Sequence, residues 1–144
     1  MRPVRLIARA VTILVAGLLL AAPAQADERL FVELSDTQGF EGVPGTFSSN
    51  IPGCATGRSY DVHAMTQLRP GVFRGTRMFR CASGIGSLTV DLSARFGDGG
   101  AVGTWSVEAG TGAFSGIRGA GGLTGTPLET SILDHYTGTV TVTG

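Results

Sequence analysis

The chain has 144 residues, of which 11 are Lys or Arg, 11 are Asp or Glu and 23 are glycine. This glycine content argues against a helical protein. The absence of a Gly-X-Y period, together with only 6 prolines, excludes collagen and an extended linker. The length is that of one domain. We therefore expect a single globular domain that is poor in helix.

Residues 1–26 have the pattern of a removable export signal. Three arginines precede an apolar run over 10–22, and Ala24-Gln25-Ala26 supplies the small residues of a cleavage site. The uncharged run of about 13 residues is shorter than the ~20 that span a bilayer as an anchor. We expect cleavage between Ala26 and Asp27 and a secreted, soluble product, residues 27–144, without a membrane anchor.

Removal of the signal leaves 118 residues with 8 arginines, no lysine and 11 acidic side chains, a formal charge of −3. A protein that binds nucleic acid needs clustered positive charge to displace counterions. The one local cluster, Arg69, Arg74, Arg77 and Arg80, lies in an acidic chain and is typical of a solvated strand face. We expect no nucleic-acid partner.

Cys54 and Cys81 are the two cysteines of the chain, and both follow the expected cleavage site. In an oxidising compartment an even count indicates a disulfide, with a free thiol pair as the alternative. Two thiols with His63 and His135 do not readily form a zinc site at these spacings, and the pair is not Cys-X-X-Cys. We expect one disulfide, no metal and no cofactor.

Apolar residues recur at every second position after residue 57 and stop at glycines, which is the pattern of strands. Residues 27–57 offer a first strand at 30–34 and then a segment rich in Gly, Ser and Pro, with one short strand at 46–48. The main body, residues 58–144, is expected to form strands at 58–68, 73–81, 88–96, 102–109, 120–126 and 136–143. Turns at 69–71 and 97–100 separate hairpin strands.

Glycines inside these strands favour a barrel over a flat sandwich. An interior glycine marks a bend or a close approach of two backbones, as at the corners of a curved sheet. The residues concerned are Gly75, Gly103, Gly125 and Gly138. We predict an all-β fold, an antiparallel β-barrel of about seven or eight strands.

The most distinctive segment of the chain is residues 103–123, with the sequence GTWSVEAGTGAFSGIRGAGGL. With Phe73-Arg74-Gly75-Thr76 and Tyr136-Thr137-Gly138, it resembles the allene oxide cyclase and dirigent barrel superfamily, especially its small exported bacterial members. The resemblance covers residues 54–144 and implies the barrel fold. Ala109 stands where the superfamily usually has glycine, and the early strands show no match to the cyclases' polar site residues, so no catalytic residue is carried over.

The glycines of 110–119 let the chain leave one strand, turn and enter the next. Phe114 and Ile117, three residues apart, are then expected to plug one end of the barrel. A phosphate-binding loop would open a helix with a lysine nearby, whereas here no lysine exists and a strand follows.

Arg77 is the most informative candidate for a site because alternation places it on one face with Phe73 and Phe79. If that face looks inward, the guanidinium must be paired, and the available partners are Asp61, Asp91 and Glu108. The alternative is an outer face with the two phenylalanines in a subunit contact.

The remaining candidates are weaker. Alternation places His63 with Asp61 and Met65 opposite Tyr60, and a solvent-facing histidine is the commoner role. His135 follows Asp134 at an expected junction of loop and strand. A strand tryptophan such as Trp105 more often packs in the core than stacks against a ligand. The ligand-binding candidates are therefore Arg77, His63, Asp61, Tyr60, Trp105, Glu108 and His135.

Three functions fit this sequence. The first is a non-catalytic exported barrel that binds a small apolar or amphiphilic molecule, or a surface. The second is an isomerase or cyclase of the allene oxide cyclase type, which would need a group of shifted pKa in its cavity. The third is a structural homo-oligomer without a ligand.

Overall fold

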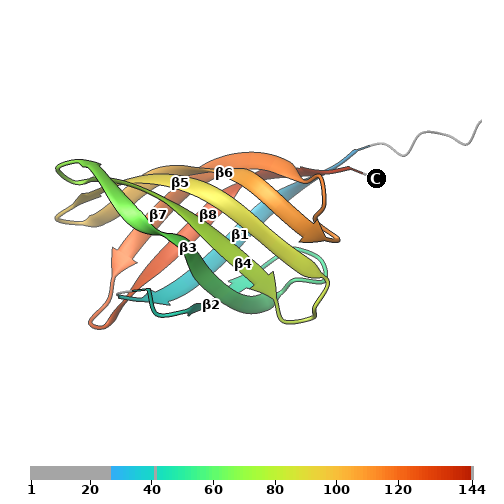
Figure 1. The fold of residues 1–144 in the computed structure, drawn as a ribbon, viewed down its shortest axis with the longest axis horizontal. Coiled ribbons are helices and arrows are strands. Elements are labelled where there is room, and N and C mark those ends of the chain that lie inside the picture. The colour runs from blue at the N-terminus through green and yellow to red at the C-terminus, as the bar shows by residue number, and fades with distance from the viewer. Residues whose placement is uncertain (1–26, 41, 144) are drawn as a thin grey trace, which may run out of the picture.

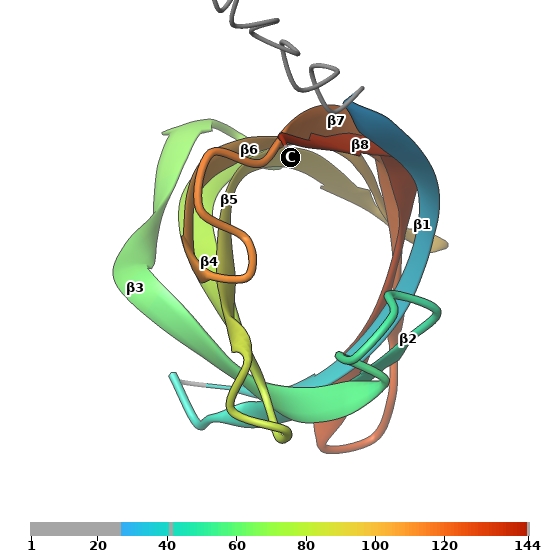
Figure 2. The same cartoon turned by 90° about the vertical axis from the view of Figure 1, so that its right-hand side faces the viewer.

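The computed structural model describes residues 27–40 and 42–143, which form one closed antiparallel barrel of eight strands (Figures 1 and 2). The strands are β1 (Glu28–Gly39), β2 (Gly45–Ser49), β3 (Thr56–Arg69), β4 (Val72–Cys81), β5 (Gly86–Gly97), β6 (Gly100–Gly112), β7 (Arg118–Pro127) and β8 (Ser131–Val142). Each strand pairs with the next one, and β1 closes the barrel against β8. The predicted fold class is confirmed.

Strict alternation of side chains builds the core. On β5, Leu88, Val90, Leu92 and Ala94 face the interior and are all buried. Eight strands enclose an interior that side chains just fill, or that holds one small ligand.

No helix in the described ranges is long and apolar enough to cross a membrane.

All eight strands are longer than the sequence predicts, and the difference changes the site most in the first and the last strand. The first was expected to end at Leu34 and the last to begin at Tyr136, but β1 and β8 pair over twelve positions, from Glu28 opposite Val142 to Gly39 opposite Ser131. The added residues include polar side chains that face the interior, such as Asp36, which interrupt the apolar alternation. His135 accordingly lies within a strand and not at its junction with a loop.

Bulges in β3 change which of its residues share a face. The register shifts between Asp61 and His63 and again between His63 and Thr66. Asp61 contacts the interior Arg77, and Met65 lies over Gly75 of β4, whereas His63 pairs with Thr76 on the outer side. The prediction that His63 shares a face with Asp61 and Met65 is therefore wrong, because a bulge adds an unpaired residue and moves the alternation by one.

One end of the barrel is closed as predicted. Figure 2 looks at this end, where the turn between β6 and β7 folds inward. Its Phe114 and Ile117 are each 5% exposed and belong to the core. The positive φ of Gly116, 75°, lets the chain make this turn.

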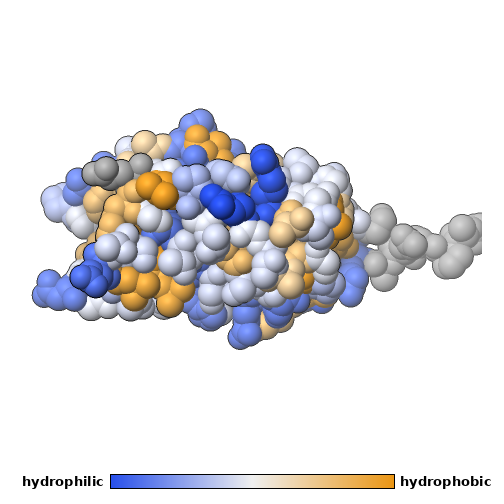
Figure 3. Space-filling view, turned by 90° about the horizontal axis from the view of Figure 1, so that it is seen from below, coloured by the Kyte–Doolittle hydropathy of each residue, from blue (hydrophilic) through white to orange (hydrophobic). Residues whose placement is uncertain are grey.

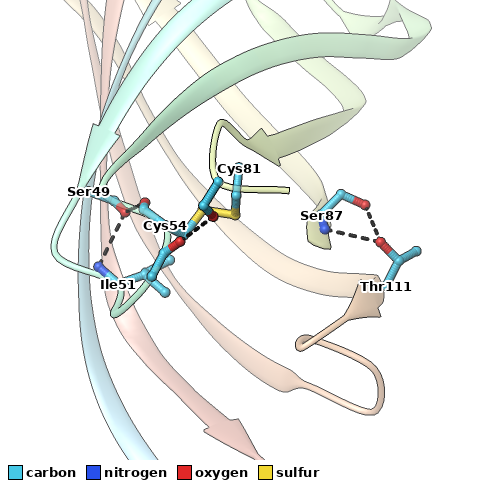
Figure 4. The surroundings of a disulfide bond; sticks show 8 residues. Ser49, Ile51, Cys54, Cys81, Ser87 and Thr111 are labelled. Carbon is cyan, nitrogen blue, oxygen red and sulfur yellow. Dashed lines mark hydrogen bonds between the residues drawn. A yellow bond between two sulfur atoms is a disulfide. The ribbon is translucent and has the colours of Figure 1, made fainter. Parts of the chain in front are cut away.

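The predicted disulfide joins Cys54 and Cys81 at the same end and ties the β2–β3 turn to the end of β4 (Figure 4). Ser49 donates its hydroxyl to the carbonyl of Cys54 at 2.6 Å. The expected export signal, 1–26, lies outside the described residues.

Candidate functional site

The barrel interior contains a cavity of about 170 Å³ at the end opposite the disulfide. Apolar side chains form most of its wall: Phe40, Met65, Leu92, Ala94, Phe96, Ala101, Leu123 and Ile132. Four polar residues also line it: Gln38, Asp61, Arg77 and Asp134. We call the polar group, together with Asp36 and Ser59 behind it, the floor. An apolar wall with a few converging polar groups is the usual composition of a ligand site.

Arg77 is the centre of the floor and is 2% exposed. Its Nε donates to Oδ2 of Asp36 at 2.6 Å, and its NH1 donates to Oδ1 of Asp61 at 2.5 Å. Its NH2 donates to the hydroxyl of Ser59 at 2.8 Å, and that hydroxyl donates to Oδ1 of Asp36 at 2.5 Å. Each of the three guanidinium nitrogens is therefore bonded to a protein acceptor.

This network decides between the two orientations of Arg77, since the guanidinium faces inward with Phe79. Of the three expected partners, Asp61 pairs with it. Asp91 instead accepts a hydrogen bond from Thr76 at 2.8 Å, and Glu108 is exposed on β6. The fully buried partner, Asp36, was not among those expected.

Asp134 on β8 lines the cavity beside this network and is 6% exposed. The amide of Gln38 on β1 donates to its Oδ2. The pKa of Asp134 is raised to about 6, first by burial and then by the negative charge of Asp36, while Arg77 and Gln38 oppose the shift. A carboxyl group with this pKa exchanges its proton in the range where general acids and bases work.

Tyr136 faces the interior two residues after Asp134 and is 2% exposed. Its ring packs edge-on against Phe79, with the centroids 5.3 Å apart. Its hydroxyl has no hydrogen-bond partner among the described residues. Burial raises the pKa of Tyr136 well above its ordinary value, and the charges of Asp134 and Asp36 raise it further. An unpaired buried hydroxyl costs about 1–3 kcal/mol, so this atom is available to a partner.

The other predicted candidates do not line the cavity. His63 and Glu108 are exposed, and His135 on the outer side of β8 is 3.1 Å from the hydroxyl of Ser35 through its Nδ1. Tyr60 stacks outside under the guanidinium of Arg80, which is 5.4 Å from the ring centroid. Trp105 fills the core.

The indole of Trp105 is anchored by its Nε1, which lies 3.0 Å from the carbonyl of Gly122 and 3.2 Å from that of Thr137. This arrangement agrees with the structural role expected for Trp105 from the sequence.

A wider hollow of about 670 Å³ lies mainly against the outer wall over β4 to β7. Leu68, Arg74, Asp91, Thr104 and Ser106 line it. It is open to solvent, and its charged side chains are not buried there. The interior cavity is the better candidate because it combines enclosure with buried, converging polar groups.

Within residues 27–40 and 42–143, no group of three or more His, Cys, Asp or Glu side chains is placed to hold a metal ion. No family model, curated protein or solved structure matches this chain. The function of this protein is therefore inferred from the geometry of the barrel itself.

Proposed function

We propose that this protein is an exported, non-catalytic barrel that binds one small, mostly apolar molecule in its open end. The observation that carries the proposal is the cavity between the plugged core and the mouth, with apolar walls and a buried polar floor. The wall supplies affinity by removing apolar surface from water, and the floor selects the polar end of the ligand.

The volume limits the size of the ligand. An apolar cavity of about 150 Å³ holds a benzene molecule, so about 170 Å³ suits one six-membered ring with a short substituent. A second hollow of about 310 Å³ adjoins the cavity and shares Phe40, Phe96, Ala101 and Ile132 with it. A longer ligand has room to extend into this hollow, which leads towards the mouth.

Exposed apolar side chains surround this entrance. They come from strand ends and the turns that follow them: Phe40, Val43, Phe96 and Leu128, which are between 38% and 57% exposed. Figure 3 shows hydrophobic residues gathered at the left end of the molecule, where Figure 1 places the β3–β4, β5–β6 and β7–β8 turns. Such a rim favours an apolar or amphiphilic ligand over a strongly hydrated one.

An NMR titration with benzyl alcohol, a neutral ring with one polar group, tests this proposal. Binding in the cavity is expected to shift the backbone amides of Leu92, Ala94 and Leu123 and to leave those around Cys54 unchanged. The variant Ala94→Leu fills part of the cavity and should lose the response. Its matched control, Ala113→Leu, changes an exposed residue at the closed end and should keep it. Shifts spread over the outer wall, with none at the cavity amides, would contradict the proposal.

The proposal also includes export from the cytoplasm and membership of a barrel family. The signal pattern of residues 1–26 and the disulfide support export to an oxidising compartment. The sequence resemblance of residues 103–123 and of Tyr136-Thr137-Gly138 is the basis for proposing membership of the allene oxide cyclase and dirigent barrel group, with which a closed antiparallel barrel is compatible.

An isomerase or cyclase is the second candidate, and one observation favours it: Asp134 lines the cavity with its pKa raised to about 6. In that case Asp134 transfers a proton while the cavity holds the substrate in a reactive conformation. Chromatography of the molecules released from wild-type and Asp134→Asn protein, both produced in the native host, tests this. Two isomers of equal mass support catalysis, whereas the same molecule from both proteins supports simple binding.

A further inference from the structure

We propose that the ligand of this cavity is a small organic cation, an amine or ammonium group on an apolar body the size of one ring. The inference rests on the proposed binding function and adds the charge of the ligand. It follows from the charges of the floor, from the atoms that remain free there, and from the aromatic rim.

The floor contains more negative than positive charge. Arg77 is its one cation among the described residues, whereas Asp36 and Asp61 both pair with it and Asp134 lies beside them. With Asp134 ionised the group carries two surplus negative charges, and with Asp134 protonated it carries one. A buried charge without a partner is unfavourable, so a bound cation would stabilise this arrangement.

The floor retains acceptor atoms that no described residue uses. Arg77 directs three of its five N–H groups to protein oxygens, and its charge is already matched by two carboxylates, which leaves little attraction for an anionic ligand. Asp61 uses Oδ1 and Asp134 uses Oδ2 in the bonds formed by the described residues, so each carboxylate has a second oxygen. An ammonium group offers the N–H donors that such oxygens accept.

A second observation points to an absent partner. The hydroxyl of Tyr136 is buried and unpartnered, and it lies within the electrostatic influence of Asp134, Asp36, Arg77 and Asp61. Tyr136 is not among the residues that line the cavity. A phenol hydroxyl both donates and accepts, so the polar end of a ligand at the floor would satisfy it through one bridging water molecule.

The entrance suits a cation with an apolar body. Phe40 and Phe96 line both the cavity and the adjoining hollow. Aromatic faces attract cations by about 0.5–2 kcal/mol, depending on desolvation, and they also pack against apolar groups. A hydrated inorganic cation gains nothing from the apolar wall, which makes an organic cation the better fit.

Amine binding should be linked to the proton of Asp134. The charged and titratable groups that face this carboxyl are Asp36 from β1, Asp61 from β3, Arg77 from β4 and Tyr136 on its own strand, while β7 places Gly125 against it. A cation favours ionised Asp134, so affinity should rise as pH increases through about 6. Between pH 5 and pH 7.5 we expect a gain of up to about tenfold.

The test compares three probes of nearly equal shape: benzylamine, benzyl alcohol and benzoate. Each is titrated into the full mature protein at pH 5 and pH 7.5, and dissociation constants are taken from the amide shifts of the cavity residues. We expect benzylamine to bind at least tenfold more tightly than the other two at pH 7.5, and its advantage to shrink at pH 5.

Charge-removing variants locate the effect. Asp134→Asn keeps the shape of the side chain and should abolish both the pH dependence and most of the preference for benzylamine. The control Glu108→Gln removes one negative charge from the exposed outer wall and should bind as wild type does. Equal or tighter binding of benzyl alcohol or benzoate at the same amides overturns the cation inference and leaves the binding function standing. Failure of all three probes overturns both.

Discussion

The guanidinium of Arg77 on β4 and the carboxylate of Asp36 on β1 form a fully buried ion pair, with 2.6 Å between Nε and Oδ2. The two strands are not neighbours in the barrel. The pair therefore connects separate parts of the wall through the interior. Beyond it towards the mouth lies the cavity, so this contact marks where the packed core ends and the cavity begins.

Replacing Arg77 by Met keeps a long apolar side chain but leaves Asp36 buried without its partner. We expect the free energy of unfolding to fall by about 3–5 kcal/mol. Urea denaturation measures this change, and the double variant Asp36→Leu/Arg77→Met should recover part of it because the carboxylate left unpaired by the single variant is removed as well. Arg80→Met, on the exposed face of the same strand, is the control and should cost no more than about 1 kcal/mol. Equal losses for Arg77→Met and Arg80→Met would contradict the structural role of the pair.

Asp134 should make stability depend on pH. Its pKa in the folded protein, about 6, lies above the ordinary value of 3.8, so the folded state binds this proton more tightly than the unfolded state does. The bound proton therefore adds to the free energy of unfolding. This stabilisation is complete below about pH 3.8 and is lost as pH rises through about 6. Asp134→Asn should therefore be about 2–3 kcal/mol more stable than wild type at pH 7.5 and nearly equal to it at pH 4. Urea midpoints at the two pH values test this, with Glu108→Gln expected to follow wild type at both.

The disulfide between Cys54 and Cys81 should stabilise the closed end by restricting the unfolded chain. The cysteines are 27 positions apart, and a loop of this size is worth about 2–4 kcal/mol. The variant Cys54→Ala/Cys81→Ala should lose this amount in thermal or urea unfolding, and a reducing agent should destabilise wild type but not the variant. Unchanged stability of wild type after verified reduction would show that the bond contributes little.

Gly138 allows the backbone of β8 to pack directly against the indole ring of Trp105. A β-carbon at this position would lie 2.6 Å from Cζ2 of Trp105 and would also contact the carbonyl of Ala120. Gly138→Ala should therefore cost about 1–3 kcal/mol and alter the fluorescence of Trp105. Gly97→Ala is the matched control, because nothing lies within 4 Å of its β-carbon position, and it should stay within about 0.5 kcal/mol of wild type. A neutral Gly138→Ala would show that this contact is not tight.

The barrel fold could be predicted from the sequence because each of its signals lies within one short segment. The alternation of β5 and the turn glycines predict strands and hairpins, and the paired cysteines and the Phe114–Ile117 turn predict the closed end. Interior glycines were expected at close approaches, and Gly138 against Trp105 is one. These features depend on period and turn chemistry, which a single segment contains.

Most of the floor could not be predicted in the same way. Asp36, Gln38 and Asp134 are polar residues at interior positions, so they interrupt the alternation that identifies a strand. The contact of β1 with β8 that brings them together joins segments about 100 residues apart and exists only once the barrel closes. Bulges in β3 then determine that Asp61 faces inward and His63 outward, and the sequence shows no signal for them.

Native mass spectrometry of the protein purified from its own host tests the central claim most directly, since it detects the mature chain and any bound molecule together. We predict a chain that begins at Asp27, carrying one small adduct that is released on unfolding and that is absent from the cavity-filling variant Ala94→Leu. A wild-type chain without an adduct, or an adduct of equal occupancy in Ala94→Leu, would contradict the account.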